Sequence, residues 1–400
     1  MHSLKLILLF AIVLALTKFK IKIGFAIAIG SVVAGLMFGM DITALAESLG
    51  KGIIAFDTWQ LLLILVSVSY LGALLKETGL ASGLTGAVES LLRSKRASMA
   101  ILPAIIGLLP MPGGALLSAP LVDEAGARTG ISGRKLAAIN YWFRHILEYV
   151  WPLYPGIILS ASILGLEASD VVRAQWPMSA GMIIGGVLFL LLPLGALNTN
   201  NGSASVNRNV RSVLAALWPI LLAVVLSLAV GIDLYLAVPA ALVLFVLLTP
   251  IPRRSLLSCA KQAAAVEYVV FVFAVMMFKQ VFVDSNAADL VAREITATGI
   301  DPIWVIIFIP FIIGLISGAT PAFVSLAYPA LLTFIKPDSV DVALMATAYA
   351  AGFLGVLLSP MHFCLVLTVQ YFRVSLVGAY PYLIGPLAFM IAGLLVRYGF

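Results

Sequence analysis

Charge is scarce in this sequence: only 10% of its 400 residues are Asp, Glu, Lys or Arg, whereas 62% are hydrophobic and the mean hydropathy is +1.13. So few polar side chains cannot cover the surface of a water-soluble domain. Apolar runs of about 18 residues or more recur from end to end. The sequence therefore predicts an all-α membrane protein that crosses the bilayer many times.

Cysteine and histidine are also rare, which limits the chemistry that sequence spacing can indicate. The two cysteines, Cys259 and Cys364, are far apart and form no CxxC pattern, so we expect neither a disulfide nor a structural zinc. The three histidines do not occur at metal-ligand spacing. No Ser/His/Asp set or paired aspartates lie in the apolar segments, so we expect no enzyme and no cofactor beyond Na⁺ as a coupling ion.

Helix-breaking residues, by contrast, are concentrated in two places. Residues 108–120 read LLPMPGGALLSAP, where two prolines and two glycines fall within five positions and break any helix. A similar break lies at residues 314–329, and the two stretches align at an offset of 207 residues, which places Gly107 on Gly314. The alignment indicates an internal duplication with a broken hydrophobic hairpin in each half.

The apolar runs predict ten spanning helices and two re-entrant hairpins, divided between repeats at residues 1–200 and 201–400. We expect helices over residues 4–17, 23–40, 58–75, 136–164, 178–194, 213–230, 234–248, 266–283, 342–371 and 377–397, and hairpins over residues 97–121 and 302–334. Prolines interrupt the helices at 136–164 and 342–371, at positions offset by 208 residues. The leading arm of the first hairpin spans about 20 Å, too short for a hydrocarbon core of about 30 Å, so it should enter and return on one side.

The distribution of basic residues predicts the orientation. Five spans per half is an odd number, so the second repeat should be inverted relative to the first. With the N-terminus outside, 16 Lys and Arg residues face the cytoplasm and 6 face the exterior, as the positive-inside rule requires. We therefore expect a multi-pass protein of a prokaryotic plasma (inner) membrane, embedded in the lipid bilayer with both termini outside. The net charge of +6 then reflects loop residues and indicates no nucleic-acid partner.

The broken segments are the first candidates for a binding site. Half-helix N-termini present free N–H groups and a partial positive charge that suit an anion, and broken backbone at membrane depth must line a cavity or lie buried in protein. The alternative is that these residues merely kink ordinary helices. The candidate substrate-binding residues at the breaks are Pro112, Gly113, Gly114, Ser118, Thr320, Pro321, Ser325, Ser359 and Pro360.

A polar face on the first interrupted helix is the second candidate. Asn140, Arg144 and Glu148 are spaced four residues apart and share one side of the helix. Asn140 and Arg144 are candidates for binding a substrate carboxylate, and Glu148, His145 and His362 for ion coupling. A structural interpretation is equally open: Arg144 and Glu148 neutralise each other, and His362 is a hydrogen-bonded residue at a helix end.

Three runs carry a resemblance to a known group: LPMPGGALLSAPLVDEAG from residue 109, FRHILEYVWPLYPG from residue 143 and GATPAFVSLAYPALL from residue 318. With its two inverted five-helix repeats, the whole chain resembles the ion-transporter superfamily. That group includes dicarboxylate/sodium symporters, gluconate and citrate permeases, arsenite-pump-like subunits and the large subunits of TRAP transporters. The runs are most similar to an uncharacterised membrane protein family within it.

The resemblance implies an elevator-type secondary transporter for a small organic anion, coupled to Na⁺ or H⁺. In such a transporter, the first three predicted helices and the sixth to eighth (residues 213–230, 234–248 and 266–283) would form a scaffold in a homodimer. The two hairpins and the remaining four helices would form the moving transport domain. The sodium/dicarboxylate members carry Ser-Asn-Thr at the hairpin tips, where this chain has Pro112-Gly113-Gly114 and Ala319-Thr320-Pro321. Sodium coupling and dicarboxylate specificity therefore do not follow from the resemblance. A cation/proton antiporter and the membrane subunit of a binding-protein-dependent transporter are the alternatives.

Overall fold

The computed structural model describes residues 1–80, 83, 94–108, 114–127, 129–195 and 206–399. This part of the chain is all-helical, with 81% of residues in helices and no strand. The chain divides into two compact units, and each contains segments from both halves of the sequence. Unit 1 comprises Met1–Val66, Pro155–Ala174 and Ala264–Ser359, and unit 2 comprises Ser67–Tyr154, Gln175–Ala263 and Pro360–Phe400.

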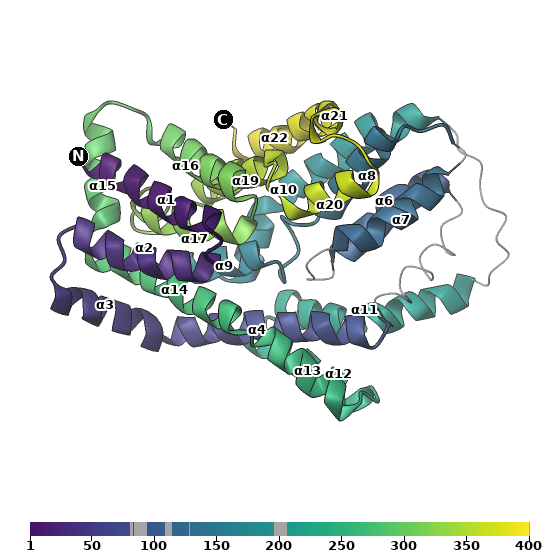
Figure 1. Cartoon of the computed structure of the whole chain (residues 1–400), viewed down its shortest axis with the longest axis horizontal. Coiled ribbons are helices and arrows are strands. Elements are labelled where there is room, and N and C mark those ends of the chain that lie inside the picture. The colour runs from purple at the N-terminus through teal and green to yellow at the C-terminus, as the bar shows by residue number, and fades with distance from the viewer. Residues whose placement is uncertain (81–82, 84–93, 109–113, 128, 196–205, 400) are drawn as a thin grey trace. The chain divides into compact units, whose positions relative to one another are not determined.

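Unit 1 contains the N-terminal helices, the second hairpin and the first arm of the second interrupted helix (Figure 1). Its helices are α1 (His2–Lys18), α2 (Ile23–Met37), α3 (Ile42–Ile54), the start of α4 (Phe56–Glu77), α9 (Pro155–Leu164), the start of α10 (Ala168–Gly186), α14 (Val266–Asp284), α15 (Ala287–Ala297), α16 (Pro302–Ser317), α17 (Thr320–Ala330), α18 (Leu332–Ile335) and α19 (Val342–Leu358).

Unit 2 contains the first hairpin, the first arm of the first interrupted helix and the C-terminal helices. Its helices are the remainder of α4 and α10, α6 (Lys95–Gly107), α7 (Gly114–Gly126), α8 (Gly133–His145), α11 (Val206–Leu228), α12 (Leu234–Leu248), α13 (Arg253–Ala263), α20 (Phe363–Tyr371), α21 (Leu376–Ala379) and α22 (Ile384–Tyr398). Short π and 3₁₀ turns extend α10 as far as Leu194, and a 3₁₀ turn at Tyr380–Tyr382 precedes α22.

The apolar helices support a membrane protein, but fewer spans are evident than the ten predicted. In the described residues, four helical segments are long and apolar enough to cross a bilayer, or five if the bent segment containing α21 and α22 counts as one span. Five further apolar helices have only 10–17 residues. At 1.5 Å per residue, such helices extend about 15–25 Å, which is short of the hydrocarbon thickness. The count of ten therefore stays a prediction.

Three amphipathic helices were not predicted, because the search for spans relied on continuous apolar runs. They are α3, α13 and α15, each with 11 to 13 residues and a mixture of apolar and charged positions. Asp41 caps α3 by accepting a hydrogen bond from the Ala44 N–H at 2.8 Å. Two of the three occupy matching places in the chain, since α3 lies between α2 and α4 and α13 lies between α12 and α14. The order of helices thus recurs, whereas the inversion of the second half stays a prediction.

Each unit combines helices from the first and the second half of the sequence. In unit 1, α14 from the second half packs against α2 and α3 from the first, as Figure 1 shows. In unit 2, α4 from the first half contacts α13 from the second, where the Tyr70 hydroxyl donates to the Leu256 carbonyl at 3.0 Å. Each hairpin likewise contacts one arm of each interrupted helix: α6 and α7 with α8 and α20, and α16 and α17 with α19 and α9.

The chain passes between the units at both helix breaks, after Tyr154 and after Ser359. Each interrupted helix therefore gives one arm to each unit. This division differs from the scaffold and transport domains that the resemblance implies, because each unit contains one hairpin together with predicted scaffold helices. The elevator partition and the repeat boundaries at residues 1–200 and 201–400 stay predictions.

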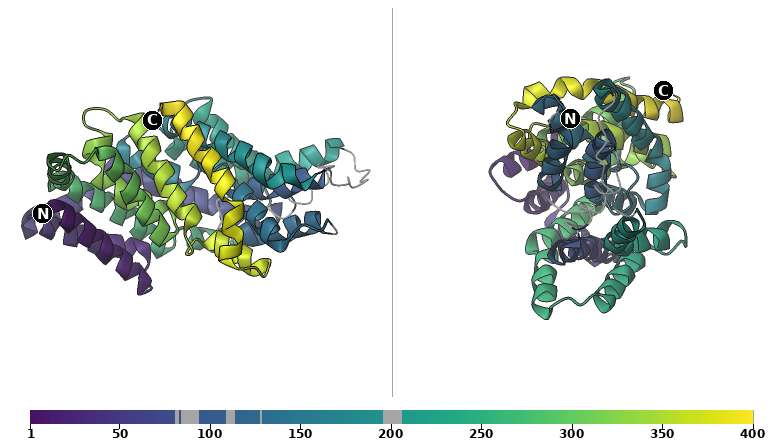
Figure 2. Two further views of the ribbon diagram at one scale, coloured as in Figure 1. Left: turned by 90° about the horizontal axis from the view of Figure 1, so that it is seen from above. Right: turned by 90° about the vertical axis from the view of Figure 1, so that its right-hand side faces the viewer.

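Glycines allow the helices within each unit to approach closely. In unit 1, a Cβ at Gly314 of α16 would meet the Gly352 carbonyl of α19, and one at Gly355 would meet the Phe311 carbonyl. In unit 2, α22 packs along α10 (Figure 2). A Cβ at Gly181 of α10 would meet the Phe389 carbonyl of α22. Small residues at contact positions are typical of helix packing in membranes, where close van der Waals contact replaces the hydrophobic effect.

Candidate functional site

The site begins with the way α8 starts and ends. Ser132 caps its N-terminus by accepting from the Lys135 N–H at 3.4 Å. The helix ends at His145, seven residues before Pro152, and the next helix begins at Pro155. Turns follow over residues 146–150, and Pro152 cannot continue a helical hydrogen-bond ladder, so no helix resumes before Pro155. The last turn of α8 therefore places Arg144 and His145 at a helix break.

Arg144 lies against both arms of the first hairpin. The Gly107 Cα of α6 packs on the Arg144 carbonyl, and the Tyr154 hydroxyl donates to the Gly107 carbonyl. At the start of α7, a Cβ built on Gly114 would lie 2.7 Å from Nη2 of Arg144. Arg144 is only 7% exposed, so a charged side chain is buried against the N-terminal turn of a helix. Only glycine at position 114 leaves room for this approach.

Asn140 lies one turn earlier on α8 and connects this helix to α7 and α20. Its Nδ2 donates to Thr368 Oγ1 of α20 at 3.0 Å and lies 3.4 Å from the Ala115 carbonyl of α7. Asn140 is fully buried, and its Oδ1 accepts no hydrogen bond from the described residues. Ser118, another candidate, is different because its hydroxyl bonds back to the Gly114 and Ala115 carbonyls of its own helix. The geometry thus favours a structural interpretation for Ser118.

Two histidines meet beside Arg144. Nε2 of His145 lies 3.1 Å from Nε2 of His362, and His145 Nδ1 lies 2.6 Å from the Tyr141 carbonyl. Because a carbonyl oxygen only accepts, Nδ1 carries a proton, and neutral His145 presents the lone pair of Nε2 to His362. The Cys364 Sγ and the histidine nitrogens lie within 4.8 Å of one another.

Glu148 lies in the turns that follow α8, so the prediction that it shares a helix face with Asn140 and Arg144 is wrong, because the helix ends at His145. Glu148 is nevertheless close to the two histidines. Its Oε1 lies 3.6 Å from Nε2 of His145, and its side chain is 13% exposed. Cys364, Tyr154 and Glu148 are all in electrostatic reach of Arg144. The predicted residues Asn140, Arg144, His145, Glu148 and His362 therefore gather in unit 2, around α8 and α20.

Cys364 is the functional candidate that the sequence analysis missed. Cys364 follows His362 by two residues, but His145 lies 217 residues before His362. Spacing along the chain therefore indicated no ligand set, and only the exchange of helix arms brings the three side chains together. Both cysteines are free: Cys259 is buried, and Cys364 is partly buried.

The remaining predicted residues lie elsewhere. Pro112 and Gly113 fall outside the described residues. Pro360 is an exposed residue at the start of the last segment of unit 2. Ser359 is buried at the end of α19 in unit 1, and Thr320, Pro321 and Ser325 belong to α17 of the same unit.

The tip of the second hairpin, where substrate-binding residues were predicted, is closely packed against α9 and α19. Gly318 ends α16 in the left-handed conformation, at φ +64°, and Thr320 begins α17. A Cβ at Gly156 of α9 would collide with the Thr320 methyl group and the Tyr349 hydroxyl. Ser325 Oγ bonds back to the Pro321 carbonyl at 2.6 Å. These side chains fill the space between α17, α9 and α19.

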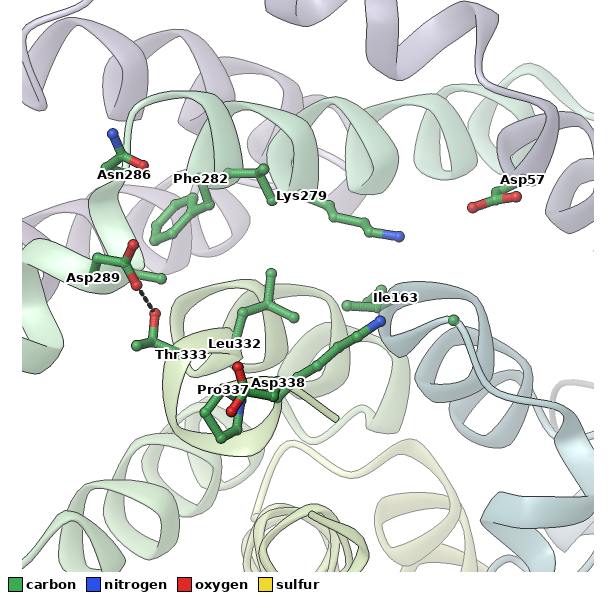
Figure 3. A pocket seen from close by; sticks show the side chains of 14 residues that line it. Asp57, Ile163, Lys279, Phe282, Asn286, Asp289, Leu332, Thr333, Pro337 and Asp338 are labelled. Atoms are coloured by element: carbon green, nitrogen blue, oxygen red, sulfur yellow. Dashed lines mark hydrogen bonds between the residues drawn. The ribbon is translucent and has the colours of Figure 1, made fainter. Parts of the chain in front are cut away.

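Unit 1 also contains a cavity of about 520 Å³ between α9, α14 and α18 (Figure 3). Lys279 extends toward Ile163, and its Nζ donates to the Ser162 carbonyl at 3.1 Å. Lys336 Nζ donates to the Leu164 carbonyl at 2.7 Å. Both lysines thus bind carbonyls at the C-terminal end of α9, where cations are favoured. This arrangement indicates helix capping.

The fold and the site together define a helical membrane protein with a buried polar cluster at a helix break. The chain belongs to the DUF401 family, described as a protein of unknown function, whose sequence profile matches residues 2–399. No curated protein matches the chain. The expected membership in an uncharacterised family agrees with this match, whereas the wider ion-transporter superfamily stays a prediction.

Proposed function

We propose that this protein is a secondary active transporter that moves a small organic anion across the plasma membrane. The proposed mechanism is elevator-type alternating access, coupled to Na⁺ or H⁺, in a homodimer. The observation that carries the proposal is the burial of the Arg144 guanidinium against the N-terminal turn of α7.

An arginine buried in an apolar helical protein costs several kcal/mol unless it is paired or hydrated, so such residues usually serve function. Its planar fork matches a carboxylate, and the N-terminal turn of a helix adds N–H donors and a partial positive charge. Gly114 keeps a side chain out of the space between them. The combination suits one carboxylate or another small oxyanion.

A thermal-shift screen of the purified protein tests the proposal. Small carboxylates, sugar acids and oxyanions are added with and without Na⁺, because a ligand that binds only the native state raises Tm by mass action. We expect at least one anion to stabilise the protein, and the same anion to be taken up by proteoliposomes under a Na⁺ or H⁺ gradient.

Arg144→Gln supplies the decisive variant. It should weaken the anion affinity by roughly 10- to 100-fold, the range for loss of a charged hydrogen-bonding partner. Arg134→Gln, an exposed change on the same helix, is the matched control and should bind normally. Normal anion binding by Arg144→Gln would reduce Arg144 to a structural residue and contradict the proposal.

Cation/proton antiport is the second candidate, since Glu148 provides a largely buried carboxylate beside the helix break. The same screen separates the two functions. If Na⁺ alone raises Tm and none of the anions does, the result would favour the antiporter.

A further inference from the structure

We propose that His145, His362 and Cys364 bind one divalent transition-metal ion of the borderline class, such as Zn²⁺ or Co²⁺. The inference concerns a resident ion and does not depend on the transport proposal. Imidazole nitrogens and a thiolate are the ligands that such ions prefer. All three donor atoms lie within 4.8 Å of one another in unit 2, on α8 and at the start of α20.

The spacing is close to that of a tetrahedral site. Bonds of about 2.0–2.1 Å to nitrogen and about 2.3 Å to sulfur place ligand atoms roughly 3.3–3.7 Å apart. The two Nε2 atoms are 3.1 Å apart, and the thiol lies within 4.8 Å of a ring nitrogen of each histidine. Small side-chain rotations are therefore enough to bring the three donors around one ion.

A hydrogen-bond partner for the other ring nitrogen of His145 is already in place. The Tyr141 carbonyl accepts the Nδ1 proton at 2.6 Å, which fixes the tautomer that leaves Nε2 free to coordinate. A backbone carbonyl in this position is the usual partner of a metal-bound histidine, because it orients the ring and raises its basicity. The Tyr141 ring also packs edge-on against both imidazoles, with centroid distances of 4.8 and 5.5 Å.

Three protein ligands leave the fourth position of the ion open, and Glu148 is a carboxylate close to it that a side-chain rotation would bring to the ion. The Glu148 Oε1 lies 3.6 Å from Nε2 of His145. Binding requires the thiolate, so the Cys364 proton leaves to solvent as the ion enters. One thiolate and one carboxylate would then balance the two charges of the ion.

The competing explanation for the short contact is a hydrogen bond between the two imidazoles, with Nε2–H of His362 donating to His145. That contact does not involve Cys364 or Glu148. The metal site needs the thiolate, so sulfur ligation distinguishes the two explanations.

Cobalt is the probe of choice, because Co²⁺ bound to a thiolate absorbs by charge transfer and four-coordinate Co²⁺ has intense visible bands. The full-length protein is purified, stripped of metal with a chelator and titrated with Co²⁺. In a parallel experiment it is dialysed against Zn²⁺, and the zinc bound per chain is measured by elemental analysis. We expect one equivalent of metal per chain, with sulfur in the first coordination shell by X-ray absorption.

The chain offers matched controls for both residue types. Cys364→Ser should abolish the charge-transfer band, and His362→Gln should weaken binding at least tenfold. Cys259→Ser and His2→Gln change the other cysteine and the remaining histidine, and both should bind normally. Size-exclusion profiles and Tm without metal check that each variant is folded.

Two results would overturn the proposal, and neither depends on the variants. One is the absence of stoichiometric Co²⁺ or Zn²⁺ from the wild-type protein. The other is bound Co²⁺ without a sulfur ligand. If Cys364→Ser folds and retains the charge-transfer band, the thiolate assignment is also wrong.

Discussion

Each of the two units contains the same type of glycine-to-carbonyl contact between two of its helices, but the side chains around the contact differ. In unit 2, Gly107 of α6 packs on the Arg144 carbonyl of α8. In unit 1, Gly314 of α16 packs on the Gly352 carbonyl of α19. Gly107 and Gly314 differ by 207 residues, and Arg144 and Gly352 differ by 208, so the contacts occupy matching places in the proposed repeats.

The side chains around this contact differ at each matching position. Where unit 2 has Arg144, a Cβ on Gly352 of unit 1 would collide with the ring of Phe323. At the same offset of 208, the positions of His145, Glu148 and Cys364 are taken by Phe353, Val356 and Gly156. At these matching positions unit 1 has aromatic and small apolar residues, whereas unit 2 has charged, imidazole and thiol groups. The same backbone packing between helices is therefore compatible with very different side chains around it.

The largest expected effect tests the shared contact. Gly107→Ala and Gly314→Ala each place a Cβ against a backbone carbonyl that cannot move aside, and each should destabilise the protein by about 3 kcal/mol. Thermal unfolding in detergent measures the loss. Gly50→Ala is the control, because nothing lies within 4 Å of the added Cβ. A large loss from one variant and none from the other would show that the two contacts are not equivalent.

Gly114→Ala tests what distinguishes unit 2. The added Cβ would lie 2.7 Å from Arg144 Nη2, so the guanidinium must shift while the backbone stays in place. We expect an anion that stabilises the wild-type protein to bind about tenfold more weakly, with little change in Tm without the anion. Isothermal titration measures the affinity, and Gly50→Ala again serves as the control. Unchanged affinity would separate the Arg144–Gly114 contact from anion binding.

The smallest expected effect compares one hydroxyl from each unit. Thr368→Val removes the partner of buried Asn140 and should cost about 1–2 kcal/mol. Thr347→Val in α19 is the matched change. Among the hydrogen bonds of the described residues, the Thr347 hydroxyl bonds only to the Ala343 carbonyl of its own helix, at 2.8 Å. Its loss should therefore lower the free energy of unfolding by less than about 0.5 kcal/mol. Thermal unfolding reports both, and equal losses would remove the special role of Asn140.

Much of the helical framework follows from the sequence. The predicted helix at residues 234–248 coincides with α12, and that at residues 266–283 differs from α14 by one residue. Long apolar runs predict such helices well because burial in lipid requires every backbone group to bond within the segment. The amphipathic α3, α13 and α15 escaped the same search, since charged residues interrupt their apolar faces.

The sequence by itself determined the membrane class, the two hairpin breaks and the placement of Asn140 and Arg144 one turn apart on α8, because composition, proline and helical periodicity act locally. Only the tertiary structure decided that His362 and Cys364 meet His145. These residues belong to different interrupted helices, and they come together because each helix sends its arms into different units. A spacing of 217 residues contains no trace of that exchange, since the packing of α20 against α7 and α8 depends on the whole unit.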